Sequence, residues 1–465
     1  MTTKETLADL WQRAALPAEA LAEIELHGSD PVLPSSFRIG EAAQATIAAS
    51  GLAAAEIRHL RGQPRQRVSV DMRHAAVAFR SERYFRVDAR ENPEVWDKIA
   101  GTYRCRDGRW VRLHTNFPHH RDGVLKLLQC AYDRDAVKAA LQNWDAPAFE
   151  DAAAAAGLVC TMMRSFAEWD AHPQGRAVAD LPVFTIEKIG ESPARQLPKL
   201  GAADAPLENV RVLDLTRVIA GPVCGRTLAA HGADVLLVSG PGIPVIESLV
   251  VDTGRGKRTT YIALGDSAGR ETLRRLLAEA DILVQGYRPG AIAGHGFGPQ
   301  QAASIRPGLV YVSLCAYSHA GPWSGRRGFD SLVQTASGMN HAEAEAAGST
   351  APRPLPCQAI DHAAGYLLAF GAVAALHRRA VEGGSWHVRV SLAQTGRWIR
   401  NLGRMEGGLG AGDPSYEDVA DLRETTESGF GKLSAVRHAA RLADTPATWR
   451  LPAMPIGSHQ PVWAC

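Results

Sequence analysis

The sequence predicts an α/β fold with a doubly wound parallel sheet, and two observations favour it. Between residues 210 and 314, short apolar runs alternate with segments of helical periodicity, the pattern of parallel strands joined by helices. The composition, 46% hydrophobic and 22% charged, is that of a globular protein. At roughly 100–200 residues per domain, a chain of 465 residues contains more than one domain.

The elements follow one another along the chain. An amphipathic helix and a loop are expected within residues 1–30, and Ala-rich helices with short strands over residues 31–200. Residues 191–206 hold three prolines and show no periodicity, which is typical of a linker. Beyond the linker we predict helices at 221–231 and 269–280, and strands at 210–215, 235–238, 260–264, 282–284 and 309–314.

An internal repeat links the two halves of the chain. Residues 41–75 align without gaps with residues 361–395, and both copies contain an Ala-rich helix, a polar turn and a strand of alternating apolar residues. The alignment places Glu41 opposite Asp361. The first copy has no preceding sheet that would build a site around Glu41, so we interpret Glu41 as non-catalytic.

Charge and cysteine content exclude several classes of protein. Lys and Arg exceed Asp and Glu by 51 − 49 = 2, so neither a nucleic-acid partner nor a membrane surface is expected. The longest apolar run, residues 363–376, is too short to span a bilayer, and the first residues lack the apolar stretch of a secretory signal. Seven cysteines without a C-x-x-C pair predict no metal site and no disulfide framework, which fits the cytoplasm.

Four segments have features of an anion-binding site. In DLTRVIAGP (214–222) a strand leads into a helix N-terminus, which attracts anions but also occurs in ordinary strand–helix turns. Residues 253–259 carry three cations suited to phosphates, or form a solvated basic turn. Gly- and Pro-rich loops at 285–290 and 316–330 follow strands, where a nucleotide-like group binds in such sheets.

A fifth segment contains Asp361 at the beginning of an apolar helix. The helix dipole stabilises a carboxylate at this position as the anion. The side chain is therefore either a simple N-cap or a carboxylate nucleophile that forms an acyl intermediate.

In this order and spacing, the five segments resemble the family III CoA-transferases of the CaiB/BaiF type. The resemblance covers residues 208–400. Its motifs are VLDLTRVIAGP (212–222), HGADV (231–235), KRT (257–259), RPG (288–290), GP (321–322), GFD (328–330), Gln334, SG (337–338) and Asp361.

Other parts of the chain resemble the same family in a different order. Residues 103–111 and 156–174 are similar to its second half, and residues 424–463 to a shortened terminal part. The resemblance therefore implies a rearranged family III fold. Its parts are a region related to the second half of the fold with a smaller α+β domain (1–200), a Rossmann-like CoA-binding domain with the catalytic aspartate (207–400) and a shortened C-terminal segment (401–465).

The resemblance implies an acyl-CoA:carboxylate CoA-transferase that acts through an aspartyl mixed anhydride and an aspartyl-CoA thioester. Acyl-CoA and a carboxylate are its substrates, no cofactor or metal is held permanently, and the family forms interlocked homodimers. Carried over to this chain, the catalytic residue is Asp361. The CoA-binding residues are Val218, Lys257, Arg258, Ile262 and Arg288, and the residues near the acyl group are Phe329 and Gln334.

Departures from the family pattern leave alternatives open. Ser239 and Gly240 stand where many members have an acidic and a basic residue for CoA, so Arg326 and Arg327 are candidates to replace them. A 2-methylacyl-CoA racemase has a histidine where this chain has Phe329. The nearest histidines, His319 and His341, lie about ten residues away, which disfavours this alternative because a proton-transfer base must lie within hydrogen-bond distance. A degenerate acyl-CoA-binding protein would bind CoA without turnover.

Overall fold

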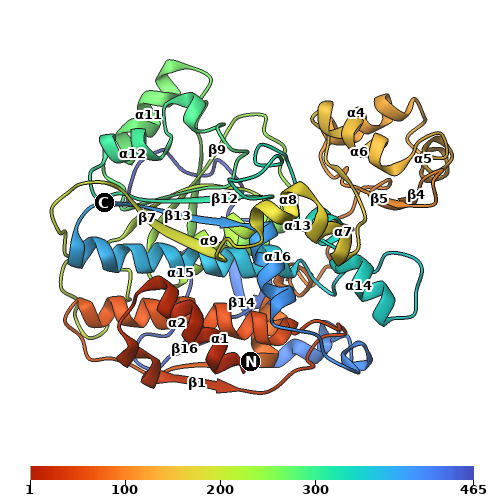
Figure 1. The fold of residues 1–465 in the computed structure, drawn as a ribbon. Helices are drawn as coiled ribbons and strands as arrows, with labels where there is room; N and C mark the ends of the chain where they lie inside the picture. Colours follow the sequence, from red (N-terminus) through yellow and green to blue (C-terminus); the bar gives the residue numbers. More distant parts are fainter. Residues whose placement is uncertain (1, 465) are drawn as a thin grey trace.

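The computed structural model describes residues 2–464, and a seven-stranded sheet forms its centre (Figure 1). Its strands lie in the order β10-β9-β8-β11-β12-β13-β7, and all are parallel to their neighbours except the edge strand β7. The predicted doubly wound parallel sheet is confirmed. The strands are β7 (Phe184–Gly190), β8 (Arg211–Leu215), β9 (Asp234–Ser239), β10 (Lys257–Tyr261), β11 (Ile282–Gln285), β12 (Val310–Cys315) and β13 (Ser385–Ser391).

Helices cover both faces of this sheet (Figure 1). One face carries α11 (Ser267–Leu277) and α12 (Pro299–Ile305), and the other carries α9 (Ala220–Ala230) and α15 (Ala359–Glu382). Successive side chains of β8 point to opposite faces of the sheet. Leu213 is therefore buried in the core under α11, and Val212 in the core between the sheet and the helices α9 and α15. Because helices bury both faces of the sheet, the sequences of these strands are continuous apolar runs.

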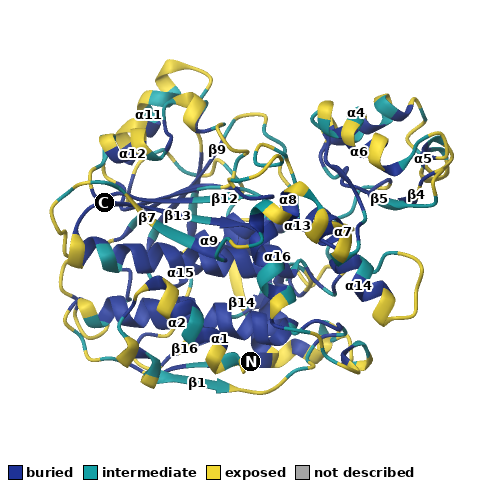
Figure 2. Ribbon diagram, in the orientation of Figure 1, coloured by how far each residue is buried: buried dark blue, intermediate teal, exposed yellow. Residues whose placement is uncertain are grey.

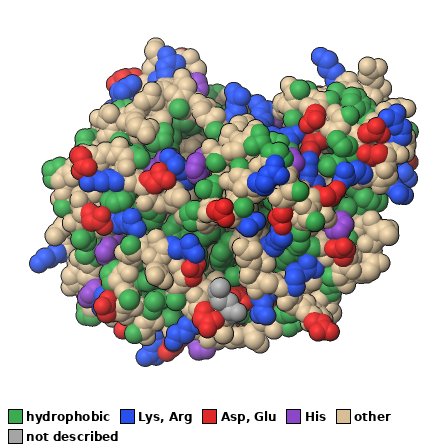
Figure 3. Space-filling model, in the orientation of Figure 1, with side chains coloured by type: hydrophobic (Ala, Val, Ile, Leu, Met, Phe, Trp, Pro, Cys, Tyr) green, Lys and Arg blue, Asp and Glu red, His purple; other side chains and the backbone are tan. Residues whose placement is uncertain are grey.

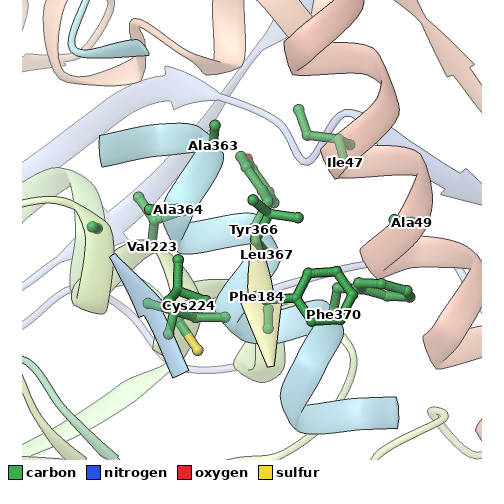
Figure 4. Packing of buried hydrophobic residues seen from close by; sticks show 14 of the residues in the cluster. Ile47, Ala49, Phe184, Val223, Cys224, Ala363, Ala364, Tyr366, Leu367 and Phe370 are labelled. Carbon is green, nitrogen blue, oxygen red and sulfur yellow. The ribbon is translucent and has the colours of Figure 1, made fainter. Parts of the chain in front are cut away.

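A second helical layer lies beneath α15. The helix α2 (Ile39–Leu60) packs along α15, and both are buried along most of their length (Figure 2). Figure 4 shows Ile47 and Ala49 of α2 on one side of this interface and Phe370 of α15 on the other. By length and composition α15 is apolar enough to cross a membrane, but its apolar stretch is entirely buried, as in the core helix of a globular protein.

The two copies of the sequence repeat contain the same elements at the same spacing. Helix α2 begins at residue 39 and α15 at residue 359; α3 (Met72–Ala78) and α16 (Leu392–Asn401) follow with an identical offset. Each copy also repeats one close contact. A Cβ added at Gly51 would lie 3.4 Å from Cγ1 of Val68, and one at Gly371 would lie 2.6 Å from Cγ1 of Val388.

The first copy has only a small sheet of its own. Its strands are β1 (Ile24–His27), β2 (Val68–Asp71) and, from the far end of the chain, β16 (Ala440–Leu442). At the start of α2, the carboxylate of Glu41 is buried and accepts a hydrogen bond from the Thr6 hydroxyl at 2.7 Å. Glu41 thus has a structural partner in α1 (Thr3–Ala14).

A smaller α+β lobe stands beside the large sheet (Figure 1). Its three-stranded sheet has the order β4-β5-β6 and its own apolar core, which includes Val111 and Leu113. The helix α13 (Asp330–Ala336) of the sheet domain contacts β5 and β6. The elements of the lobe are β4 (Gly101–Arg104), β5 (Trp110–Leu113), β6 (Cys160–Met162), α4 (Pro118–Leu128), α5 (Arg134–Leu141) and α6 (Ala146–Ala155).

The last part of the chain joins the two halves. Strand β15 (Gly431–Val436) pairs with β14 (Arg423–Ser428) and with β3 (Arg86–Val87) of the first half. Residues 191–206 contain no helix or strand, as predicted for a linker. The remaining helices are α7 (Phe166–Ala171), α8 (Pro173–Val178), α10 (Glu247–Thr253) and α14 (Met339–Ala346), with short 3-10 turns at Ala18–Glu23, Ser81–Arg83, Ala293–His295, Gly408–Gly410 and Glu417–Leu422.

Candidate active site

Asp361 is the third residue of α15, and its side chain is only 6% exposed. Within residues 2–464 its carboxylate has no hydrogen-bond partner, although its backbone N–H has one. The side chain lies where two cavities meet, and both cavities are lined by Val218, Ile219 and Phe329 as well as by Asp361. A buried carboxylate without a partner, open to two cavities, is available for chemistry.

Asp330 supplies the helix cap that Asp361 does not. The N-cap residue of α15, Gln358, makes no side-chain hydrogen bond to the helix, and Asp330 Oδ2 instead accepts the Asp361 N–H at 2.9 Å. Gln334 Nε2 donates to the other oxygen of Asp330 at 2.5 Å. The N-cap alternative for Asp361 is therefore wrong, because Asp330, the first residue of α13, has that role.

Electrostatics around Asp361 disfavour its charged form. Burial raises the pKa of Asp361 well above its usual value, and the negative charges of Asp330 and Glu82 raise it further. Burial also raises the pKa of Asp330 to about 6, although hydrogen bonds to its oxygens act against this. A carboxylate with a raised pKa is a stronger base and nucleophile once it is ionised.

The first cavity, which we call the basic cavity, has a volume of about 260 Å³. It lies at the carboxyl ends of β8, β11 and β12, beside the point where the strand order reverses and where such sheets bind ligands. Asp361 is the only acidic side chain among its described lining residues, which include the arginines Arg217, Arg288, Arg326 and Arg327. Figure 3 shows Lys and Arg side chains gathered where the small lobe adjoins the body. The cavity is therefore suited to an anionic ligand.

The second cavity, which we call the interdomain cavity, has a volume of about 460 Å³. One wall comes from residues 82–96 together with His114 and Asn116 of the first half. The opposite wall comes from the sheet domain and includes Ile246, Leu249, Asp330, Ser331 and Gln358. The first half of the chain thus packs on the sheet domain of the same chain and helps to enclose Asp361.

Comparison with known proteins identifies the sheet domain. Residues 207–415 match the model of CoA-transferase family III. This part of the chain resembles family III CoA-transferases. An acyl-CoA transferase of Gibberella moniliformis is 27% identical over 419 residues, which cover 80% of this chain and 72% of that protein. The human succinyl-CoA:glutarate CoA-transferase is 31% identical over 182 residues, covering 37% of this chain and 41% of that protein.

Solved structures resemble the family III region in part. A CAIB/BAIF family protein from Brucella suis is 25% identical, covers 49% of this chain and 65% of its own, and superposes with a TM-score of 0.37. The chain spans about half the length of several of the curated relatives that it matches.

Four of the residues predicted from the family III motifs lie together in the basic cavity: Val218, Arg288, Phe329 and Asp361. Val218 has a φ of 77°, in the left-handed region that a β-branched residue rarely adopts. Such strain is typical of functional sites, and here it occurs between β8 and α9 where the two cavities meet.

The other residues predicted from the family III motifs do not line the basic cavity. Lys257 is completely buried, and its ammonium donates to Asp214 Oδ2 and to the Pro222 carbonyl, each at 2.8 Å. The predicted basic turn is the beginning of β10, since the strand starts at residue 257 and not at 260. Arg258 pairs with Asp234, Ile262 is buried in the core under α11, and Gln334 is buried against Asp330.

Three residues of the site were not assigned a role from the sequence. Asp330 belongs to the GFD motif, but its capping contact depends on the fold. Arg217 follows β8 and lines the basic cavity. The ring of His114 stacks on Phe329 with centroids 4.0 Å apart, so the fold brings a histidine to the position that the sequence left without one. Burial lowers the pKa of His114 to about 3, so the ring is neutral.

Proposed function

We propose that this protein is an acyl-CoA:carboxylate CoA-transferase in which Asp361 carries the acyl group. The observation that supports this most directly is the unpartnered carboxylate at the junction of a basic cavity and a second, larger cavity. The basic cavity receives the phosphates of CoA, and the interdomain cavity receives the acyl group and later the acceptor.

The reaction proceeds through two kinds of acyl intermediate. The Asp361 carboxylate attacks the thioester carbonyl, the C–S bond breaks, and a mixed anhydride and CoA thiolate form. The thiolate then attacks the Asp361 carbonyl carbon, which releases the donor carboxylate and gives an aspartyl-CoA thioester. An acceptor carboxylate attacks that thioester and expels the thiolate. Attack of the thiolate on the acceptor acyl carbon forms the new acyl-CoA and restores Asp361.

Residues around Asp361 support each step. The four arginines of the basic cavity balance the phosphate charges and hold the thiolate near the reacting carbonyl. The backbone N–H of Ala220, the first residue of α9, has no helical partner and borders the same cavity, so it can stabilise the oxyanion. Enclosure by the first half of the chain limits hydrolysis of the anhydride.

Replacement of the nucleophile tests the proposal. We expect Asp361→Ala to abolish CoA transfer while CoA binding persists, because the arginines remain in place. The variant Glu41→Gln changes the equivalent carboxylate of the repeat, and we expect it to keep most of the activity. After incubation with acyl-CoA and hydroxylamine, mass spectrometry should find the modification on the peptide that contains Asp361. Full activity of Asp361→Ala would refute the assignment.

A racemase remains a second candidate because His114 lies beside Phe329 and shares the interdomain cavity with Asp361. Such an enzyme moves a proton at the carbon next to the thioester. With 2-methylacyl-CoA in D₂O and no acceptor, a racemase incorporates deuterium at that carbon. We expect no incorporation, because a neutral ring with a strongly lowered pKa is a weak base.

A further inference from the structure

Beside Trp96, a lining residue of the interdomain cavity, lies a buried guanidinium that makes no hydrogen bond or ion pair among the described residues. Arg112 on β5 is 8% exposed, and among the described residues its side chain makes neither a hydrogen bond nor an ion pair. Its Nε is fully buried. The two terminal nitrogens also have no hydrogen-bond partner, but they are accessible to solvent. Burying an unpaired charge is unfavourable, so an anion that pairs with it on binding is the natural explanation.

The surroundings of Arg112 direct it towards this cavity. Alternation along β5 sends Val111 and Leu113 into the core of the small lobe, and Arg112 to the opposite face. There the guanidinium lies 5.3 Å from the ring centroid of Trp96, a residue that lines the interdomain cavity. The charge of Asp330, which lines the same cavity, acts on Arg112 from beyond ion-pair distance.

Each acidic residue that lines the interdomain cavity, except Asp361, already has a hydrogen-bond or ion-pair partner. Glu82 pairs with His362 at 3.0 Å, and Glu94 accepts a hydrogen bond from the backbone N–H of Trp96 at 3.0 Å. Both oxygens of Asp330 accept hydrogen bonds. Asp361 reacts with one end of the substrate, and two nearby cations have no anionic partner among the described residues: Arg112 beside Trp96, and Arg83, which is exposed in the lining.

We propose that the acyl group and the acceptor carry a second carboxylate and that Arg112 binds it. The substrates are then dicarboxylic acids and their CoA monothioesters, and this inference rests on the transferase function proposed above. One carboxyl group reacts at Asp361 while the other pairs with the guanidinium, whose planar fork matches a carboxylate. The cavity volume of about 460 Å³ lies in the range of small-molecule sites.

Isotope exchange within matched acyl pairs tests this assignment. Labelled glutarate exchanges into glutaryl-CoA, and labelled valerate into valeryl-CoA, so the two reactions differ only in the distal carboxylate. We expect wild-type kcat/KM for glutarate to exceed that for valerate by about 10- to 100-fold, the range of a charge-assisted hydrogen-bonded pair. In Arg112→Met we expect the glutarate value to fall by a similar factor and the valerate value to stay within about twofold.

Two further variants separate anion binding from structure. Arg112→Lys keeps the charge but not the fork, and we expect it to retain part of the preference for glutarate. Arg104→Met removes an exposed charge from the neighbouring strand β4 and should change neither exchange rate. Since Arg112 makes no hydrogen bond or ion pair within the chain, Arg112→Met should not lower the thermal unfolding temperature.

The outcomes distinguish this inference from the function on which it rests. Equal exchange of glutarate and valerate by the wild type, or an unchanged preference in Arg112→Met, overturns the role of Arg112 and leaves the transferase intact. If no labelled acid exchanges into its thioester and hydroxylamine traps nothing at Asp361, the transferase function fails and this inference fails with it.

Discussion

At the scale of single residues, two neighbouring carboxylates have separate tasks. Asp330 accepts the N–H of Asp361 and the amide of Gln334, so it orders the beginning of α15. Asp361 has no such contact and keeps its oxygens free. Because both side chains are buried and close in space, the ionisation of one raises the pKa of the other.

The charge on Asp330 can be removed without removing its hydrogen bond to the Asp361 N–H, although the bond from Gln334 is lost. In Asp330→Asn the amide oxygen still accepts the Asp361 N–H, while a negative charge that raises the pKa of Asp361 is lost. Attack requires the Asp361 anion, so activity falls as the pH falls through that pKa. We therefore expect the acidic limb of kcat/KM against pH to move to lower pH. A limb that stays in place or moves upward would contradict this coupling.

Lys257 is a structural cation in this fold. Its ammonium is completely enclosed with Asp214, and removal of one partner leaves the other charge buried and uncompensated. We expect Lys257→Met to lower the free energy of unfolding in urea by about 3–5 kcal/mol. The double variant Lys257→Met, Asp214→Leu should recover part of this loss. A normal stability with a raised KM for acyl-CoA would instead favour the role predicted from the sequence.

At the scale of elements, α15 positions Asp361, the proposed nucleophile, and depends on close packing against β13. A Cβ at Gly371 would lie 2.6 Å from Cγ1 of Val388, closer than real side chains approach. We expect Gly371→Ala to destabilise the protein by about 1–3 kcal/mol, measured by chemical denaturation. The double variant with Val388→Ala should regain most of it, because that change removes the contacting methyl group. Additive losses in the two single variants would refute a direct clash.

Elements that depend on local sequence could be predicted, whereas features that depend on contacts between distant segments could not. The strands between residues 210 and 314 are predictable because a strand that is buried on both faces has a continuous apolar sequence. The start of β10 was missed because a lysine reads as solvated, whereas here it is neutralised by Asp214 on another strand. Asp361 was found through its motif. The cap from Asp330 and the stacking of His114 on Phe329 depend on distant segments, which no local pattern encodes.

At the scale of the whole molecule, both walls of the interdomain cavity come from one chain. Residues 82–116 enclose Asp361 from the first half, although the chain reaches α15, which carries Asp361, only after the linker. The interlocked homodimer implied by the family resemblance stays a prediction. Because both walls of the interdomain cavity come from one chain, we expect each chain to form its own complete site.

Complementation tests whether the two walls act within one chain. One variant, Asp361→Ala, lacks the nucleophile, and the other, Trp96→Ala, lacks part of the opposite wall. When the two are co-expressed, we expect no more activity than the sum of the separately purified variants, because no chain holds both intact walls. Sites shared between subunits would instead return about a quarter of wild-type activity, since half of the dimers are mixed and each holds one intact site. Recovery at that level would show that the first half encloses the aspartate of a partner.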